Sequence, residues 1–510
     1  MNFLDSKPRS IYKDYYIWRY LDQNVTSDNA VKLLGETKRV NRKLFLRFAK
    51  RVDDKSYKKI AKCYKMRPKE FLKSDEDCIK IGFSIYDATK LTKQELKTIN
   101  SKIKDRYKDL YEAIDVLIDN NPFNKLLRSD NKTFFFVFNH IGSKYRLKHF
   151  NKIIPKKIVS KLSNDRRFNY SVKLIVTNLK LKKLQKSILD INSSNLNANS
   201  NFFLAMNALR YNDKKKAIKY LSIADKKFYY RFDKDKVLFW KYLITKDLDI
   251  LYKLTKSFDA NIYSIYALQK LNSIKSLNII SNIKCKNCNA KNDIADPFTW
   301  LKILKQLNLK ESNLTKIANN FTSCKELPYK AFTLERLNYK NYFIVPYKKY
   351  LQKIPLNKRV LILSIARQES RFIPASISSS YALGMMQFMP FLTRAMAKKL
   401  KIKNFDLDNI FHPKIAYKFA SKHLDYLDKK LHHPLLIAYA YNGGIGFTLK
   451  MLKQGFFQKG QYEPYLSMEL VPYDESKRYG KKVVANYIIY SSIFGKNINI
   501  KTLFQKLIKP

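Results

Sequence analysis

The sequence predicts a mostly α-helical protein with more than one domain. Its 510 residues are too many for a single hydrophobic core. Only 11 glycines and 15 prolines are present, which disfavours an all-β chain with many tight turns. Along much of the chain, apolar residues recur three and four positions apart, as they do on one face of a helix. With 45% hydrophobic residues, most of the chain is expected to fold.

The first half of the chain predicts an α-solenoid made of helical hairpins. Short helical patterns separated by polar breaks cover residues 28–34, 42–49, 95–103 and 204–209. Residues 201–225 predict two antiparallel helices with a turn near Asn212, and 236–244 with 248–256 predict another pair. No strict period is present, so this prediction depends on the hairpins and not on a repeat.

A polar loop with two cysteines follows the solenoid. Residues 283–293 are rich in Asn and Lys and predict a loop. Cys285 and Cys288 form a single CxxC, which without a second pair or a nearby His is weak evidence for zinc. We expect either a short disulfide between these two residues or two free thiols. The chain has five cysteines, so at least one thiol is left unpaired.

The charge of the chain is extreme, with 100 Lys and Arg residues against 42 Asp and Glu and a formal net charge of +58. One interpretation is a polyanionic partner: a nucleic acid, an anionic membrane or an acidic cell-wall polymer. The other is a genome-wide bias, because Lys, Asn, Ile, Tyr and Phe are all abundant. The basic residues are scattered, so the composition permits nucleic-acid binding without requiring it.

The sequence predicts neither a membrane span nor a signal peptide. The apolar run TFFFVF at 133–138 is far shorter than the roughly 18 residues that cross a bilayer. Residues 1–18 lack an uninterrupted apolar segment. We therefore expect either a cytoplasmic protein or a mature form whose original start has been removed or replaced.

Glu369 is the candidate catalytic residue. Residues 357–371 predict a buried helix, because positions 360–366 are almost wholly apolar. Leu361, Ile365 and Glu369 are four residues apart, so the carboxylate continues an apolar stripe at the C-terminal end of the helix. The helix dipole and partial desolvation should both raise its pKa, as a general acid requires. Taken alone, the pattern also fits a surface Glu where a helix emerges into solvent.

Three further motifs follow Glu369-Ser370: YALGMMQFMP at 381–390, AYAYNGG at 438–444 and VPYDESKRY at 471–479. In this order, the four motifs resemble the catalytic domain of the soluble lytic transglycosylases. That family's pattern is Glu-Ser, Gly-Leu-Met-Gln-x-Met-Pro, Ala-Tyr-Asn-Ala-Gly and Pro-x-x-Glu-Thr-x-x-Tyr. The segment SIYKDYYIWRYL at 10–21 is similar to the opening of the family's long N-terminal superhelix.

The resemblance implies three domains. An α-superhelix, ring-shaped in the family, is expected over 1–258, a small helical linker domain over 259–335, and a goose-type-lysozyme-like, α-rich catalytic domain over 336–510. The glycines agree with the last boundary, because eight of the 11 lie between positions 384 and 495. Glycine gathered in one part of a glycine-poor chain indicates special backbone geometry and often a binding cleft.

The resemblance also implies an activity. Glu369 would protonate the glycosidic oxygen between N-acetylmuramic acid and N-acetylglucosamine in peptidoglycan. It would then act as a base, so that the muramic acid 6-hydroxyl attacks its own anomeric carbon and a 1,6-anhydro sugar forms. The residues expected to line the sugar subsites are Ser378, Gln387, Met389, Tyr441, Asn442 and Glu475. For Met389 the alternative is core packing, and for Tyr479 a structural and a binding role stay open.

The same resemblance implies peptidoglycan glycan strands as the partner, in the periplasm of a Gram-negative bacterium. We expect a monomer that binds no nucleic acid and needs neither a metal nor an organic cofactor. Three positions depart from the family pattern. Tyr381 replaces a glycine, which implies a reshaped loop under the sugar site, and Gly443 replaces an alanine. Gly480 lies inside an expected helix, at a cost of about 1 kcal/mol relative to Ala.

Two other functions stay open. A hydrolytic muramidase on the same fold would position a water, for which glycosidases usually employ a second carboxylate. No Asp or Glu lies between Glu369 and Asp406, which favours the transglycosylase. A basic solenoid that binds nucleic acid or wall polymer, with an inactive domain attached, would need aromatic residues interleaved with Lys and Arg in a groove. The sequence shows these residues only dispersed.

Overall fold

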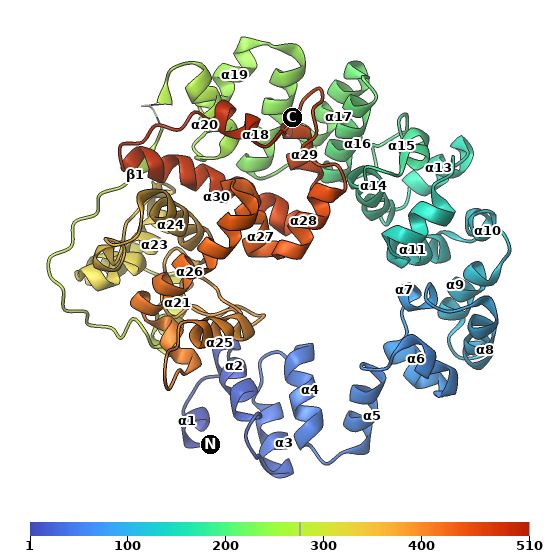
Figure 1. Cartoon of the computed structure of the whole chain (residues 1–510), viewed down its shortest axis with the longest axis horizontal. Coiled ribbons are helices and arrows are strands. Elements are labelled where there is room, and N and C mark those ends of the chain that lie inside the picture. Colours follow the sequence, from blue (N-terminus) through green and yellow to red (C-terminus); the bar gives the residue numbers. More distant parts are fainter. Residues whose placement is uncertain (275–276, 509–510) are drawn as a thin grey trace.

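The computed structural model describes residues 1–274 and 277–508 and is built almost entirely of helices arranged as a ring (Figure 1). The predicted mostly α-helical class is confirmed. The sheet within the described residues consists of two short parallel strands, β1 (Ile279–Ile280) and β2 (Asn341–Tyr342). In the same residues, no helix combines the length and the apolar character that a membrane span requires.

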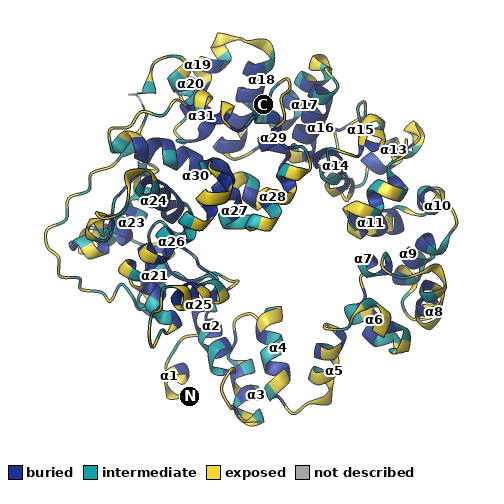
Figure 2. Ribbon diagram, in the orientation of Figure 1, coloured by how far each residue is buried: buried dark blue, intermediate teal, exposed yellow. Residues whose placement is uncertain are grey.

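Helices α1 to α19, which we call the solenoid, follow the rim of the ring in sequence order (Figure 1). Neighbouring helices pack against one another through buried apolar faces, while their polar faces are exposed (Figure 2). The solenoid helices are α1 (Asn2–Asp5), α2 (Ile11–Tyr20), α3 (Ser27–Gly35), α4 (Arg42–Arg51), α5 (Lys55–Cys63), η1 (Pro68–Lys73), α6 (Glu76–Gly82), α7 (Ile85–Ala88), α8 (Lys93–Ile103), α9 (Lys108–Ile118), α10 (Pro122–Arg128), α11 (Asn131–His140), α12 (Ser143–Tyr145), η2 (Arg146–Phe150), α13 (Lys156–Ser163), α14 (Phe168–Thr177), α15 (Lys182–Ser187), α16 (Ala198–Arg210), α17 (Lys214–Lys227), α18 (Arg231–Thr245) and α19 (Leu248–Thr255).

The hairpins expected from the sequence are present. Helices α16 and α17 form the first pair, and the chain reverses between them at Asn212, whose φ is 60°. Asn tolerates this left-handed conformation because its short polar side chain can bond locally. Helices α18 and α19 form the second pair, with Lys246 at φ 62° between them. The polar loop predicted over 283–293 is also found.

The remaining helices occupy one side of the ring (Figure 1). The long helices α24 and α30 pack against each other, and α27 packs against α30. These elements are α20 (Ile262–Lys270), α21 (Pro297–Leu307), α22 (Leu314–Asn320), η4 (Cys324–Glu326), α23 (Leu327–Asn338), η5 (Lys348–Tyr350), α24 (Leu356–Ser370), α25 (Pro390–Lys399), η6 (Leu407–Phe411), α26 (Pro413–Leu431), α27 (Pro434–Gly443), α28 (Ile445–Lys453), α29 (Tyr465–Leu470), α30 (Asp474–Ile493) and α31 (Ile500–Gln505).

Both ends of the solenoid contact the C-terminal part, and this closes the ring. At the N-terminal end, the Arg19 guanidinium of α2 lies 2.5 Å from Asp406 Oδ2 and 2.7 Å from Asp408 Oδ1, at the start of η6. At the other end, Asp233 Oδ2 of α18 lies 3.6 Å from Arg478 Nη2 of α30. In α20, which follows the solenoid directly, the hydroxyl of Tyr263 donates to Glu469 Oε1 at 2.6 Å. Lys481 Nζ of α30 lies 2.6 Å from the other oxygen of Glu469.

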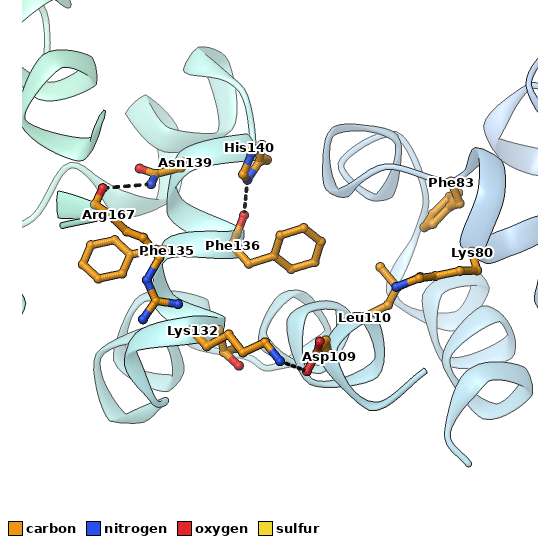
Figure 3. A pocket seen from close by; sticks show the side chains of 11 residues that line it. Lys80, Phe83, Asp109, Leu110, Lys132, Phe135, Phe136, Asn139, His140 and Arg167 are labelled. Carbon is orange, nitrogen blue, oxygen red and sulfur yellow. Dashed lines mark hydrogen bonds and ion pairs between the residues drawn. The ribbon is translucent and has the colours of Figure 1, made fainter. Parts of the chain in front are cut away.

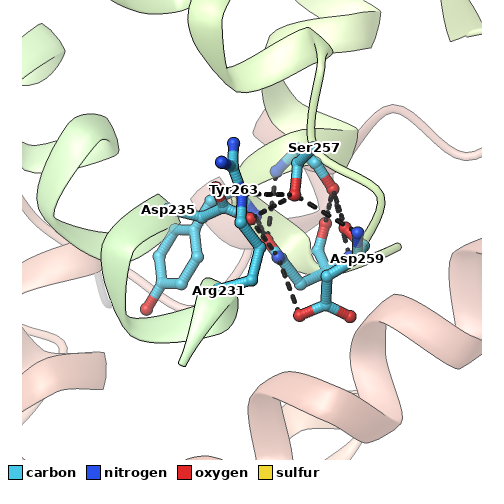
Figure 4. A network of polar contacts seen from close by, with 7 residues as sticks. Arg231, Asp235, Ser257, Asp259 and Tyr263 are labelled. Atoms are coloured by element: carbon cyan, nitrogen blue, oxygen red, sulfur yellow. Dashed lines mark hydrogen bonds and ion pairs between the residues drawn. The ribbon is translucent and has the colours of Figure 1, made fainter. Parts of the chain in front are cut away.

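A polar network fixes the connection between α19 and α20 (Figure 4). The Asp235 carboxylate of α18 pairs with Arg231 at 2.8 Å and accepts hydrogen bonds from Ser257 Oγ (2.5 Å) and Asn261 Nδ2 (2.8 Å). Asn261 also caps α20, where its side chain accepts from Tyr263 N and Ser264 N. The network thereby orients the helix that carries Tyr263 to Glu469.

The expected arrangement of the CxxC cysteines is wrong. Cys285 forms a disulfide with Cys324, and Cys288 is a free, exposed thiol. The chain around residue 286 runs beside residues 322–324, with Lys286 N donating to Thr322 O at 2.8 Å and Cys324 N donating to Asn287 O at 2.9 Å. This pairing brings together two cysteines that are 39 residues apart. A second disulfide joins Cys63 to Cys78.

Candidate active site

Glu369 lies in the last turn of α24, whose preceding residues from Val360 to Arg367 are buried as the sequence predicts. The helix ends at Arg371, where a φ of 57° turns the chain away. The Glu335 carboxylate of α23 holds this end, because it accepts from Arg371 Nε at 2.7 Å and from Arg367 Nη2 at 2.8 Å. Glu369 therefore projects from a well-anchored helix terminus.

The Glu369 carboxyl group accepts a hydrogen bond from the Tyr479 hydroxyl at 2.8 Å. Burial raises the pKa of Glu369 to about 8; the hydrogen bond from Tyr479 opposes this shift and the charge of Glu475 adds to it. The raised pKa expected from the sequence is present, with desolvation as its main cause. At neutral pH the carboxyl group is mainly protonated, so it can donate a proton.

Glu369 remains partly exposed and opens into a pocket of about 510 Å³. One wall is the end of α24 and the loop that follows it. The other walls come from distant parts of the chain, with Tyr12 of α2 on one side and Trp300 of α21 on another. The pocket thus lies where the solenoid, the segment after it and α24 meet.

Residues 371–389 join α24 to α25, and we call them the connecting loop. Three of the predicted sugar-binding residues lie on it. Ser378 Oγ accepts from Ala382 N at 2.9 Å, and Gln387 Nε2 donates to the carbonyl oxygens of Ser376 (3.2 Å) and Gly384 (2.8 Å). These two side chains therefore brace the loop itself. Met389 is half-buried directly before α25.

The other predicted binding residues lie at the junction of α27 and α30. The Tyr441 hydroxyl donates to Met386 O at 2.8 Å and ties α27 to the connecting loop. Asn442 Nδ2 donates to Glu475 Oε1 at 2.9 Å, and Asn442 Oδ1 accepts from Ser476 Oγ at 2.6 Å. Glu475 is exposed in the first turn of α30.

The fold brings four of these groups close enough to influence one another's ionisation. Glu369 interacts with Glu475, Tyr441 and Tyr479, and each of these contributes to a pKa shift within the group. The sequence left the role of Tyr479 open, and its only signal was its place in the fourth motif. No sequence motif indicated that α2 and α21 would form walls of this pocket, because they belong to distant segments.

The comparison with protein families identifies the part of the chain that holds this site. The family model of the transglycosylase SLT domain matches residues 347–463. The chain therefore carries an SLT domain. The match contains Glu369 and the predicted binding residues Ser378, Gln387, Met389, Tyr441 and Asn442. Tyr12, Trp300 and Glu335 precede it, and Glu475, Ser476 and Tyr479 lie beyond its end. The predicted domain boundaries stay predictions.

Relatives with known names agree with the SLT domain. A putative soluble lytic murein transglycosylase of Haemophilus influenzae is 28% identical over 168 residues, which cover 33% of this chain and 28% of the relative's own length. An inactive mutant of the lytic transglycosylase Slt from Pseudomonas aeruginosa superposes with a TM-score of 0.53 over 96% of this chain and 88% of that one. The 70 kDa soluble lytic transglycosylase of Escherichia coli superposes with a TM-score of 0.51 over 100% of this chain and 89% of that one. Both structures are 14% identical in sequence, so these matches show a shared fold.

A second pocket, of about 390 Å³, lies in the solenoid away from the SLT domain (Figure 3). Phe83, Phe135 and Phe136 give it apolar walls, and the cationic side chains of Lys80, Lys132 and Arg167 also line it. Two of the cations are paired within the protein: Lys132 lies 2.7 Å from Asp109, and Arg167 is bound by Asp165. These pairs reduce the charge that the pocket could offer to an anion.

Proposed function

We propose that this protein is a lytic transglycosylase that cleaves the β-1,4 bond between N-acetylmuramic acid and N-acetylglucosamine in peptidoglycan. The observation that carries the proposal is Glu369. Its carboxyl group, which belongs to the SLT domain, is protonated near neutral pH, is oriented by Tyr479, and opens into a pocket between that domain and the segments before it. A single group of this kind can serve first as acid and then as base.

At the end of the reaction Glu369 is protonated again. The carboxyl group gives its proton to the glycosidic oxygen, the bond from that oxygen to the anomeric carbon breaks, and the leaving sugar keeps the proton. The carboxylate then takes the proton of the muramic acid 6-hydroxyl, and the oxygen of that hydroxyl bonds to the anomeric carbon. The product is a 1,6-anhydro sugar, and no water is consumed. The Tyr479 hydroxyl stabilises the carboxylate between the two steps.

The proposed sugar subsites comprise the connecting loop and the junction of α27 and α30, which the Tyr441 hydroxyl joins to that loop. Ser378, Gln387 and Met389 lie on the connecting loop, and Asn442 and Glu475 lie at the junction. Hydroxyl, amide and carboxylate groups suit the hydroxyls and acetamides of the sugars, and Tyr441 offers an apolar ring. The net charge of +58 suits a wall that bears peptide carboxylates. We propose that the protein acts in the periplasm on glycan strands, as a monomer and without a cofactor.

A hydrolytic muramidase is the second candidate, and Glu475 favours it. The sequence contains no acidic residue soon after Glu369, yet Glu475 lies close enough to raise the pKa of Glu369. A second carboxylate could activate a water in place of the 6-hydroxyl. In the structure, however, Glu475 accepts a hydrogen bond from Asn442, which engages one of its oxygens.

Mass spectrometry of the soluble products tests the proposal. Purified peptidoglycan is incubated with the protein and with Glu369→Gln, which keeps the size of the side chain but cannot transfer a proton. We expect 1,6-anhydro-N-acetylmuramic acid ends from the wild type and a rate lower by about 10²–10⁴-fold for the variant, with unchanged circular dichroism. Products heavier by one water would identify a muramidase instead. Full activity of Glu369→Gln would rule out Glu369 as the proton donor, and no release by the wild type would favour a polymer-binding protein.

A further inference from the structure

The connecting loop holds a bulky residue in an unfavourable backbone conformation. Tyr381 has a φ of 64°, in the left-handed region where a large side chain is strained. It ends a tight turn in which Tyr381 N donates to Ser378 O at 2.9 Å, and the next residue donates to Ser378 Oγ. A strained residue persists only where surrounding contacts hold it in place. The contacts of Tyr381 should therefore determine the shape of the turn that carries Ser378.

The contacts that hold Tyr381 come from the solenoid. Only 1% of its surface is exposed, and its ring centroid lies 5.9 Å from that of Tyr15 and 5.6 Å from that of Trp18, both in α2. The Arg47 guanidinium of α4 lies 3.7 Å from the Trp18 ring centroid and pairs with Asp22 at 3.0 Å. Aromatic contacts of this kind and full burial are strongly favourable, and they offset the backbone strain.

Two polar contacts connect the rest of the turn to the same part of the solenoid. Asn41 Nδ2 donates to Ser379 O at 3.3 Å, and Lys43 Nζ donates to Ser380 O at 3.2 Å. Ser379 and Ser380 are themselves exposed. Three of the four residues of the turn 378–381 thus contact the solenoid, Tyr381 through its buried ring and Ser379 and Ser380 through their carbonyl groups.

We propose that Tyr381 is a positioning residue, through which the first helices of the solenoid set the geometry of the Ser378 turn in the active site. The inference rests on the proposed function. Glu369 is held by Tyr479 and by the anchored end of α24. The hydrogen bond from that end to the connecting loop, Ser370 Oγ to Met385 O at 2.9 Å, lies outside the turn 378–381. Releasing the turn should therefore weaken the binding of the glycan strand and leave the proton chemistry of Glu369 unchanged.

Tyr381→Gly tests this inference, because it removes the ring and also removes the backbone strain, so that the chain can still fold. With purified glycan strands as substrate, we expect KM to rise by at least ~10-fold, while kcat and the pH dependence of kcat change little. Tyr381→Phe retains the buried ring and should restore the wild-type KM. Asn41→Ala combined with Lys43→Ala changes only the solenoid and should raise KM in the same direction.

Three results would overturn the inference while the wild type still releases anhydro products. They are an unchanged KM in Tyr381→Gly, a fall in kcat at constant KM, and a KM increase that appears only at temperatures where the variant unfolds. A wild type that releases no sugar would instead contradict the proposed function. The wild-type assay therefore distinguishes a failure of this inference from a failure of the proposed function.

Discussion

At the scale of single residues, the site depends on one carboxyl group that is kept protonated. Burial and the nearby charge of Glu475 favour the neutral form of Glu369, and the hydrogen bond from Tyr479 favours the charged form. The resulting pKa of about 8 lies near the working pH, where a group can both give and take a proton.

Because the ordinary pKa of a Glu side chain is 4.5, the folded state binds the proton of Glu369 more tightly than the unfolded state. Its contribution to stability is therefore present at low pH and is lost as the pH rises through about 8.

The pH dependence of catalysis should report this balance. We expect kcat/KM to fall above about pH 8, where Glu369 loses its proton. Tyr479→Phe removes the hydrogen bond that favours the charged form, so the alkaline limb should move to higher pH. Initial rates of muropeptide release between pH 5 and about 10 measure both profiles.

Tyr490→Phe is a matched control for this experiment. Its hydroxyl is also buried and lies on the same helix, but it donates to Ile344 O and not to Glu369. The control should lose stability without moving the alkaline limb. If Tyr479→Phe left the limb in place, or shifted it to lower pH, the assignment of Tyr479 as the partner that opposes protonation of Glu369 would be wrong.

At the scale of elements, α30 joins the parts of the site. It carries Tyr479 toward Glu369 and Lys481 toward Tyr263 of α20, and Gly480 between them faces α27. A Cβ atom at Gly480 would lie 2.3 Å from a ring carbon of Tyr439. The glycine that seemed a cost within a helix therefore allows the close approach of α27 and α30, on which the Tyr441 and Tyr479 hydroxyls depend for their positions.

Gly480→Ala should destabilise the protein. The added methyl group would overlap the buried Tyr439 ring, so we expect a loss of about 1–3 kcal/mol in the free energy of unfolding. Gly446→Ala in α28 is the control, because its added Cβ would have no atom from another part of the protein within 4 Å and alanine favours a helix. Denaturant titrations compare the two variants. A Gly480→Ala variant as stable as the wild type would contradict the packing argument.

At the scale of the whole molecule, the ring is held by contacts between distant segments and by two disulfides. Arg19 joins the start of the chain to the residues at the start of η6, and Asp233 joins the end of the solenoid to Arg478 of α30. The Cys63–Cys78 disulfide lies in the solenoid, and Cys285–Cys324 spans the segment that follows it. Such bonds persist in oxidising compartments, which agrees with the proposed periplasmic location.

The disulfides predict a thiol count. Protein denatured without a reductant should show one reactive thiol, that of Cys288, and protein treated with a reductant should show five. Peptide mass mapping after alkylation would place the label on Cys288. Label on Cys285 or Cys324 before reduction would contradict the pairing.

The sequence alone determined the features that are encoded within a few neighbouring residues. Helical periodicity predicted the mostly α-helical class and the two helices on either side of Asn212. The apolar run before Glu369 predicted a buried helix with a carboxyl group at its end. The tertiary structure alone decided what those segments contact. Tyr479 lies 110 residues from its partner Glu369. Cys285 is bonded to Cys324 and not to Cys288, and Tyr381 packs against aromatic residues of α2. The physical reason is that periodicity and capping depend on local geometry, whereas these contacts depend on how the whole chain packs into a ring.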